Sequence, residues 1–486
     1  MFRDQGFSDL QERLGCHYAV REYCVQYRET DFDFVSRLLE EEGIYYYFTH
    51  ANGKHTLVLA DSPAAHEPFP GYAKIPYHPE QGGIDKARAD HLHAWTLERE
   101  VQPGAHALTD YDFKKPKADL TAKSAIIMPH AHAEYERFDY PGRYTEVGNG
   151  EHLARSRMEE RRAQFEGFAG QGNARGLGAG HVFTLAEHRR TQLNREYLVV
   201  SATYRLRLDS YLASASTGAA DDLFHCTCQA LDSAHPYRPP RRTVKALVHG
   251  AQTAVVVGPA GEEIYTDQYG RVKVQFHWDR YGKQDENSSC WIRVSQPWAG
   301  QHWGMVSLPR IGQEVVVDFL EGDPDRPLIT GSVYNNSQMP PYALPANKTQ
   351  SGIKSRSSKG GQPAHFNEIR FEDKKGAEQV YIHAEKNLDS VVENCESHSV
   401  GANRTKTIGH DETTHVKHDR TETVDHNETV TVGKDILITA GDSITLTVGA
   451  STLIMKSNGS ITLNGINLDV TGSEHIQLDS TRIDLN

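Results

Sequence analysis

The sequence predicts a multidomain, mainly β protein: an α+β domain with barrel-like strands, an OB-fold barrel and a C-terminal intertwined triple-stranded β-helix built by a homotrimer. Helix and strand signals mix in the first half of the chain, short alternating strands follow, and an eight-residue repeat fills the C-terminal part. A length of 486 residues allows three or four domains. The expected parts are residues 1–235, 243–340, a connector at 341–386 and a needle at 387–486.

Local signals define the α+β domain. Thr30 with Asp33 three positions later resembles a capping box, and Gly43 suits a C-cap, so a helix is expected between them. Two strands are expected on either side of Asn52-Gly53, a dipeptide typical of tight hairpins. The glycine-rich run Gly170–Gly180 has no expected strand before it and no helix after it. It is therefore interpreted as a flexible turn and not as a dinucleotide-binding loop.

The OB barrel follows a linker rich in proline and arginine, His235–Arg242. Turn residues separate short alternating strands at regular intervals, which fits a closed barrel of five or six strands. Barrels of this type often bind single-stranded nucleic acid, but 8 basic against 11 acidic residues argue against that ligand here. The expected strands are Val244–Val248, Val272–Phe276, Trp291–Ser295, Gly304–Leu308, Glu314–Phe319 and Leu328–Val333.

Residues 387–450 form eight consecutive octads. Position 6 of each octad is apolar, and position 7 is glycine in five of the eight, so the period marks a repeat architecture. Alternation places positions 2, 4 and 6 on one face, whereas positions 3 and 5, largely threonine, form the other. Glycine at position 7 permits the positive φ expected at a corner between strands. The predicted repeat core is Val392, Val400, Ile408, Val416, Val424, Val432 and Val448.

One apolar anchor per octad is too little to order a single chain, because every residue loses backbone entropy. Three copies wound round a common axis pair both edges of every strand and bring position 6 into a narrow interior. A single-chain solenoid needs mostly apolar inward residues, and position 4 holds Lys406 and Glu422. A flexible threonine-rich stalk is the other alternative. After Ala450 the phase loosens, and a differently packed, more apolar tip is expected.

The charge and the apolar pattern exclude several classes of function. The formal net charge is −13, and residues 387–486 carry 15 acidic against 7 basic side chains. Such a needle repels nucleic acid and anionic membranes, so membrane contact is expected to be transient only. No apolar stretch approaches the about 18 residues of a membrane span, and the N-terminus lacks a signal-peptide core. Six scattered cysteines suit a chain that is cytoplasmic when made.

Few residues suggest chemistry. Glu368, Glu372 and Asp373 are close in sequence, but a solvated strand edge accounts for them better than a glycosidase pair. The motifs GxSxG, GxxxxGK[ST] and HExxH are absent. Cys226 and Cys228 have the wrong spacing for a zinc ribbon. We therefore expect no catalytic residue, no enzyme activity and no cofactor.

Histidine is the open question of the repeat. His410, His418 and His426 occupy position 8 of three consecutive octads. In a trimer, position 8 would repeat as rings of three imidazoles, which transition metals accept as ligands. The alternative is that position 8 lies at a solvated corner, and on that interpretation no metal is expected.

Three long stretches carry a family resemblance: Arg21–Phe48, Gly270–Gly282 and Trp291–Asn335. They contain REYCVQYRETDFDFVSRLLEEEGIYYYF, GRVKVQFHWDRYG and WIRVSQPWAGQHWGMVSLPRIGQEVVVDFLEGDPDRPLITGSVYN. The chain closely resembles the VgrG family, the valine–glycine repeat spikes of type VI secretion systems, over essentially its whole length. The resemblance implies a hub like that of contractile phages (residues 1–235, without the start of its first barrel), an OB domain and a needle like a phage tail spike.

The resemblance also implies a function and partners. The expected function is a trimeric spike, driven mechanically through a target envelope without catalysis, assembled in the cytoplasm and then secreted. The expected partners are a hexameric tube protein, a PAAR-type protein that caps the tip at Ile483 and Leu485, and secreted effectors with their adaptors. A phage-type tailspike that cleaves glycans or binds a receptor is the alternative.

Overall fold

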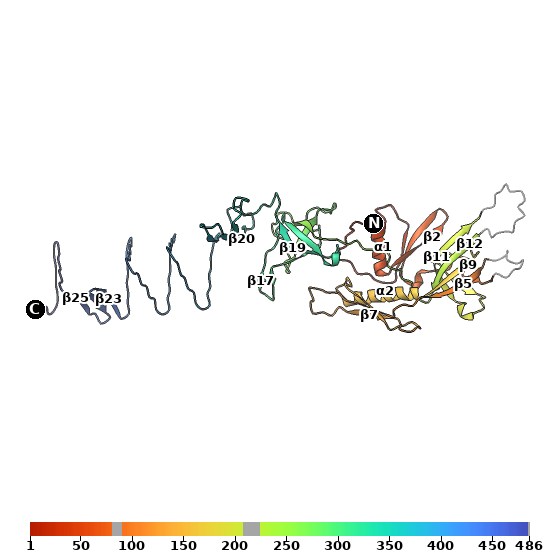
Figure 1. The fold of residues 1–486 in the computed structure, drawn as a ribbon, viewed down its shortest axis with the longest axis horizontal. Helices are drawn as coiled ribbons and strands as arrows, with labels where there is room; N and C mark the ends of the chain where they lie inside the picture. The colour runs from red at the N-terminus through yellow and green to blue at the C-terminus, as the bar shows by residue number, and fades with distance from the viewer. Residues whose placement is uncertain (80–89, 208–223, 485–486) are drawn as a thin grey trace. The chain divides into compact units, whose positions relative to one another are not determined.

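The computed structural model describes residues 1–79, 90–207 and 224–484 (Figure 1). The chain divides into two compact units, Met1–Asp389 and Ser390–Asn486. The first unit contains the hub, the OB barrel and the connector, and the second contains nearly all of the needle. No helix in the described ranges combines the length and the apolar character needed to cross a membrane.

Helix α1 (Asp31–Glu42) begins and ends where the sequence predicts. The side chain of Thr30 accepts a hydrogen bond of 3.1 Å from the backbone N–H of Asp33. Gly43 ends the helix with a φ of 77°, a left-handed conformation that costs glycine little. Helix α2 (Val147–Phe165) is the longer of the two and packs against one sheet of the hub.

Three sheets build the described part of the hub. The predicted hairpin is confirmed, because β2 (Tyr45–Ala51) and β3 (Lys54–Ala60) pair antiparallel across Asn52-Gly53, and β1 (Leu10–Arg13) pairs in parallel with β3. The second sheet has the order β4-β10-β11-β12-β9-β5 and the third the order β7-β6-β8. The remaining bounds are β4 Lys74–Pro76, β5 Leu92–Arg99, β6 Ala105–Leu108, β7 Ala122–Ala125, β8 Glu136–Asp139, β9 Glu166–Gly172, β10 Val182–Ala186, β11 Glu196–Leu206 and β12 Phe224–Asp232, with short 3₁₀ helices η1 Pro63–Ala65 and η2 Thr191–Leu193.

The glycine-rich run Gly170–Gly180 is irregular and turn-forming only from Asn173 onward, and its first three residues belong to a strand. Gly170 and Gly172 belong to strand β9. The sequence does not indicate this strand, because glycine has no side chain and so shows no alternation of apolar and polar residues. A Cβ on Gly170 would lie 2.7 Å from the buried Trp95 ring. A Cβ on Gly172 would lie 2.1 Å from the carbonyl oxygen of His91 on the neighbouring chain segment. These glycines therefore allow close packing of the largest core in the hub.

Gly172→Ala is expected to destabilise the protein by about 1–3 kcal/mol, because the methyl group overlaps a backbone oxygen that cannot move without shifting β5. Gly167→Ala is the matched control in the same strand, since no atom lies within 4 Å of its added Cβ. That control is expected to change stability by no more than about 0.5 kcal/mol. Guanidinium unfolding of both variants measures the difference. Equal effects would show that β9 accepts a side chain at position 172.

The OB barrel closes as predicted. Its five strands have the order β14-β13-β18-β19-β15, and a bridge between Val272 and Ile292 joins the two outer strands. The two backbone hydrogen bonds of this bridge are 3.0 Å and 2.8 Å long. The bounds are β13 Gln252–Val257, β14 Lys273–Phe276, β15 Arg293–Val294, β16 Trp298–Ala299, β17 Gly304–Met305, β18 Glu314–Phe319 and β19 Pro327–Val333, with η3 at Leu320–Gly322.

Two expected strands do not belong to this barrel. Gly304–Met305 (β17) pairs with β16 in a separate two-stranded sheet, so the expected barrel strand Gly304–Leu308 is wrong. The first expected strand is wrong as well. Residues 244–248 are not a strand, Val244 is 83% exposed, and β13 takes the place in the barrel instead. Polar contacts explain the difference, since the backbone N–H of Thr243 donates to Glu40 of helix α1 and Lys245 forms ion pairs with acidic residues of the barrel. The segment therefore serves as a tether between hub and barrel.

The junction between hub and barrel is made of charged groups. Asp323, only 2% exposed, pairs with Lys245 at 2.5 Å and with Arg143 of the hub at 3.2 Å. Arg326 of the barrel pairs with the hub residue Asp110 at 3.0 Å. Buried ion pairs depend on both partners, because removal of one leaves an uncompensated charge. The junction is therefore a specific, polar contact within the first unit.

His106 on β6 makes the stability of the hub depend on pH. Its side chain is 2% exposed, and neither ring nitrogen has a hydrogen-bond partner in the described structure. Burial, together with the nearby cations Arg241 and Arg157, lowers the pKa of His106 to about 4. An unfolded chain takes up this proton near pH 6.5, so it binds more protons than the folded chain between these values.

The contribution of neutral His106 to the free energy of unfolding is therefore expected to be fully present above pH 6.5. It is expected to fall as the pH drops from 6.5 to about 4 and to change no further below that. The loss is expected to reach about 3 kcal/mol. Urea unfolding of wild type and His106→Leu across this range isolates the contribution, because leucine does not titrate. A constant difference between the two proteins from pH 7 to pH 4 would contradict it.

The connector forms a three-stranded antiparallel sheet with two unlike faces. Ile353, Ile369 and Ile382 are in register across it, and Phe371 pairs with Val380. These five side chains are 44–65% exposed, so one face is apolar and uncovered in the single chain. An exposed patch of this kind marks an interaction surface. The strands are β20 Gln350–Lys354, β21 Glu368–Glu372 and β22 Gln379–His383.

Candidate functional site

The octads form an extended zigzag in the second unit (Figure 1). From residue 390 to 442 the backbone bends at positions 7 and 8 of each octad, which confirms one extended stretch and one corner per repeat. The expected positive φ at the corner is wrong, since Gly401, Gly409, Gly433 and Gly441 lack it. Other octads place glutamate, lysine or aspartate at this position, so the corner needs no left-handed residue.

The repeat ends one octad earlier than the sequence predicts. Ser443–Val448 (β23) turns back at Gly449, which has a φ of 55°, and pairs antiparallel with Ser451–Lys456 (β24). Strand β25 (Ile461–Asn464) completes this small sheet. Val448 is consequently 80% exposed at the end of a hairpin and differs from the other predicted core residues.

The zigzag leaves its backbone unpaired. Within the described chain, no backbone–backbone hydrogen bond involves residues 384–441. Buried or ordered backbone N–H and C=O groups require partners, and two open edges on each extended stretch offer them to neighbouring strands. The open edges of this segment are therefore available to strands from other chains.

The apolar side chains at position 6 are placed alike in six consecutive octads. Their exposed fractions lie between 46% and 50%, whereas Val391, next to the first of them, is 83% exposed. Each octad therefore covers about half of its own apolar side chain at position 6, which we call the anchor. The other half is exposed in the same way in each of the six octads. The six residues are Val392, Val400, Ile408, Val416, Val424 and Val432.

The candidate metal ligands lie at the corners. The Nδ1 atom of His410 is 2.6 Å from a carboxylate oxygen of Asp411, and that of His418 is 2.7 Å from Asp419. Both imidazoles are 91% exposed, and no hydrogen bond to either Nε2 atom is present among the described residues. Within the described part of one chain, no three histidine, cysteine or acidic side chains come together to hold a metal ion.

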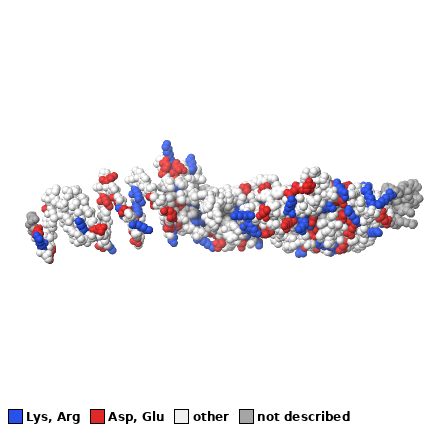
Figure 2. Space-filling view, turned by 90° about the horizontal axis from the view of Figure 1, so that it is seen from below, with Lys and Arg blue, Asp and Glu red and all other residues white. Residues whose placement is uncertain are grey.

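Charges alternate along the octads. Position 2 of five consecutive octads reads glutamate, arginine, glutamate, arginine, glutamate. Figure 2 shows basic and acidic side chains interspersed on the face that it displays, over both units. In the single chain, Glu412 pairs with Lys406 and Arg420 pairs with Glu422, so these charges do not pair with one another along position 2. The five residues are Glu396, Arg404, Glu412, Arg420 and Glu428.

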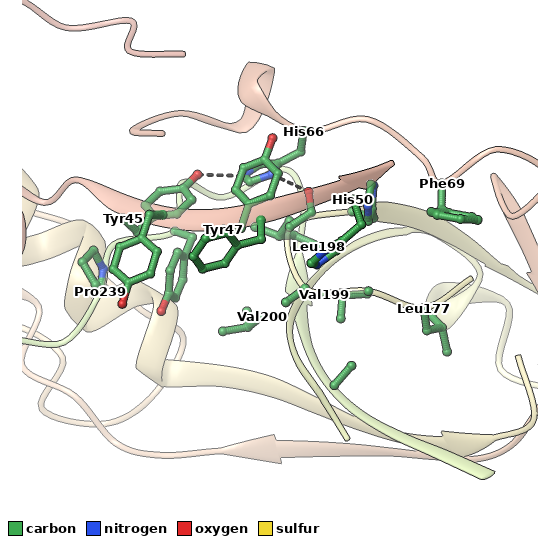
Figure 3. A pocket seen from close by; sticks show the side chains of 18 of the residues that line it. Tyr45, Tyr47, His50, His66, Phe69, Leu177, Leu198, Val199, Val200 and Pro239 are labelled. Carbon is green, nitrogen blue, oxygen red and sulfur yellow. Dashed lines mark hydrogen bonds between the residues drawn. The ribbon is translucent and has the colours of Figure 1, made fainter. Parts of the chain in front are cut away.

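The hub contains an aromatic groove that sequence inspection missed. It has a volume of about 880 Å³ and lies between strand β2, the glycine-rich run before β10, and strand β11 (Figure 3). Tyr45, Tyr47 and Phe69 line it together with aliphatic residues such as Leu198 and Val200. The run of four aromatic residues at 45–48 is the signal in the sequence that could have indicated it.

The polar atoms of the groove are occupied by one another. His66 donates from Nδ1 to the carbonyl oxygen of Gly180 at 2.8 Å, so its Nε2 atom accepts from the Tyr45 hydroxyl at 2.7 Å. Burial lowers the pKa of His66 and raises that of Tyr45, which keeps both groups neutral at pH 7. The Tyr47 hydroxyl donates to the carbonyl oxygen of Ala65. This arrangement suits packing and recognition more than proton transfer.

The other residues noted in the sequence lie apart from the groove. Glu368 is buried beside Arg370, whereas Glu372 accepts from the hydroxyl of Thr349. Burial raises the pKa of Cys226 to about 11 and that of Cys228 to about 12, so both thiols stay protonated in the core of the hub. Of the two tip candidates, Ile483 is 50% exposed, and Leu485 lies outside the described residues.

Three family descriptions match this chain in succession. Residues 2–210 match the phage tail baseplate hub, and residues 253–334 match the type VI secretion system/phage-baseplate injector OB domain. Residues 351–463 match the bacteriophage T4 gp5 C-terminal trimerisation domain. The order agrees with the hub, the closed barrel and the octads described above.

Curated relatives decide the family. The spike protein VgrG1b of Pseudomonas aeruginosa PAO1 is 56% identical over 408 residues, 84% of this chain and 54% of the relative. VgrG1a of the same strain is 56% identical over 401 residues, 82% of this chain and 62% of the relative. The chain belongs to the VgrG family of type VI secretion system spike proteins.

The VgrG family also includes longer proteins. The actin cross-linking toxin VgrG1 of Vibrio cholerae serotype O1 is 38% identical over 410 residues, which are 84% of this chain and 36% of the toxin. The present chain spans about half the length of the curated VgrG relatives named above. What those proteins do as wholes is therefore carried over only as a proposal.

Proposed function

We propose that this protein is the homotrimeric puncturing spike of a type VI secretion system, which crosses a target envelope mechanically and carries a tip cap and effector cargo with it. The observation that carries the proposal is the unpaired zigzag with its half-covered anchors at position 6. Three copies would supply strand partners on both edges and cover the exposed half of each anchor.

The geometry of such a trimer follows from the repeat. One octad occupies one of three faces and rises one strand spacing, about 4.8 Å, before the chain turns to the next face. On any face, an octad of one copy then lies above the preceding octad of a second copy. Neighbours in space are therefore consecutive octads from different chains.

The alternating charges support this arrangement, in which neighbouring chains are offset by one octad. With an offset of one octad, Arg404 lies between Glu396 and Glu412 of other copies, and every contact among the five charged residues at position 2 is attractive. With an offset of two octads, arginine would meet arginine and glutamate would meet glutamate. The pattern thus favours one register of three chains and disfavours the nearest alternative.

The connector supports the same assembly. Its apolar face, defined by Ile353, Ile369, Phe371, Val380 and Ile382, is uncovered in the single chain and precedes the octads in sequence. Second and third copies of the same face would cover it. The hub and OB domain would then act as the base that receives thrust, with no catalytic step required.

The partners are proposed on the same basis. A hexameric tube protein would bind behind the hub, a PAAR-type protein would cap the tip near Ile483 and Leu485, and effectors with their adaptors would travel as cargo. The spike would assemble in the cytoplasm and leave the cell when fired. The closed barrel with more acidic than basic residues supports no role in nucleic-acid binding.

The mass of the full chain in solution tests the assembly. Native mass spectrometry is expected to give three times the chain mass of 54.4 kDa. A secretion-competent bacterium that lacks its own spike is then expected to regain export of its tube protein when it expresses this chain. A monomer at micromolar concentration would contradict the trimer, and a trimer that restores no export would contradict the role as a spike.

A further inference from the structure

We propose that the trimeric needle binds divalent transition-metal ions, such as Zn²⁺ or Ni²⁺, at three columns of histidines on its outer edges. Each column contains His410, His418 and His426, one from each of the three copies. The proposal rests on the trimer proposed above and adds a binding site that a single chain does not contain.

The columns follow from the one-octad offset. A chain turns a corner at every position 8, so its three histidines lie on three different edges of a triangular rod. On one edge, His418 of a second copy lies about 4.8 Å above His410 of the first, and His426 of the third copy lies about 4.8 Å higher still. Identical histidines of the three copies are on different edges, so the column replaces the ring that the sequence suggested.

The side-chain geometry of the single chain prepares these histidines as ligands. Asp411 and Asp419 lie within hydrogen-bond distance of the Nδ1 atoms, at 2.6 Å and 2.7 Å, and a carboxylate there takes the Nδ1–H. A carboxylate on one ring nitrogen fixes the tautomer and leaves the lone pair of Nε2 for a metal, the arrangement common around zinc. Both rings are exposed in the single chain, at the corners that form the outer edges of the proposed rod.

Neighbouring charges favour a cation at the same edge. By the same offset, Asp411 of one copy lies below Asp419 of the next, which brings two carboxylates to each column. Zinc–nitrogen bonds are about 2.0–2.1 Å long, so two imidazoles one strand spacing apart can tilt toward a shared ion between them. Two further ligands, the third imidazole and a water or two waters, complete the tetrahedral set.

The repeat also provides an internal comparison. His415 is in the same octad as His418, but it occupies position 5. Its neighbours above and below in a trimer are Thr423 and Thr407, which do not suit zinc or nickel. His415 therefore lies outside any column, and its replacement is a matched control for the replacement of His418.

Zinc content of the trimer tests the proposal. The full chain without a histidine tag is stripped with EDTA, confirmed as a trimer by native mass spectrometry and dialysed against Zn²⁺, and bound zinc is measured by elemental analysis. Wild type and His415→Gln are expected to hold three more ions per trimer than His418→Gln. The variant loses all three because the middle ligand is missing from every column.

Two results would overturn the proposal separately from the spike itself. A verified trimer with the same zinc content in wild type and His418→Gln would refute the columns and leave the spike intact. An equal loss in His415→Gln and His418→Gln would place the ions elsewhere. A chain that stays monomeric would refute the columns together with the trimer on which they depend.

Discussion

Val416→Asp is expected to abolish the trimer. Val416 is at position 6 in the middle of the repeat, and about half of its surface is free in the single chain. In a trimer, three aspartates would replace three valines at the level where position 6 lines the narrow interior. Each substitution loses about 1.5–3 kcal/mol of apolar burial and adds several kcal/mol for an unpaired buried charge. Light scattering is expected to show monomers where wild type shows trimers.

Thr413→Asp is the matched control for this result. Thr413 belongs to the same octad, but position 3 is on the outer face, where a carboxylate remains in water. We expect this variant to stay trimeric, with a change in stability within about 0.5 kcal/mol per chain. If both variants assemble, the anchors at position 6 do not line an interior. If both fail, the loss reflects added negative charge on an already acidic needle.

Local chemistry is what the sequence predicts well. The cap of α1 depends on Thr30, Asp33 and Gly43, which are neighbours in sequence, and the hairpin depends on Asn52-Gly53 alone. The octad corners are equally local, since they recur wherever the period places them. In each case the residues that cause the feature lie within one turn or one repeat of it.

Features that depend on distant partners could not be predicted from the sequence. The aromatic groove needs β2 opposite β11, and Asp323 meets Arg143 only after hub and barrel have folded. The glycines of β9 suggest a turn in the sequence, because the side chains that fill the space above them, such as Trp95, come from another strand. The backward turn at Gly449 could not be predicted, because the eighth octad keeps the repeat pattern and yet pairs with the segment that follows it.

The junction between hub and OB barrel is expected to be the most sensitive point of the first unit. Asp323→Ala removes the carboxylate that pairs with Lys245 and Arg143, and Lys245 is only 9% exposed. Its ammonium group would keep one partner, Asp325, and lose the more deeply buried one. Breaking a buried pair in this way costs about 3–5 kcal/mol. Guanidinium unfolding of the full chain measures the loss.

Loss of an exposed ion pair is the control for this experiment, because it distinguishes the effect of burial from the effect of removing a charge. Asp9 pairs with Lys54 at 2.9 Å, and both side chains are more than half exposed. Asp9→Ala is therefore expected to cost no more than about 1 kcal/mol. If Asp323→Ala costs equally little, the junction does not depend on its buried charges. If it costs the expected amount and the hub and barrel then unfold in two separate transitions, these charges are what makes the hub and the OB barrel one cooperative body.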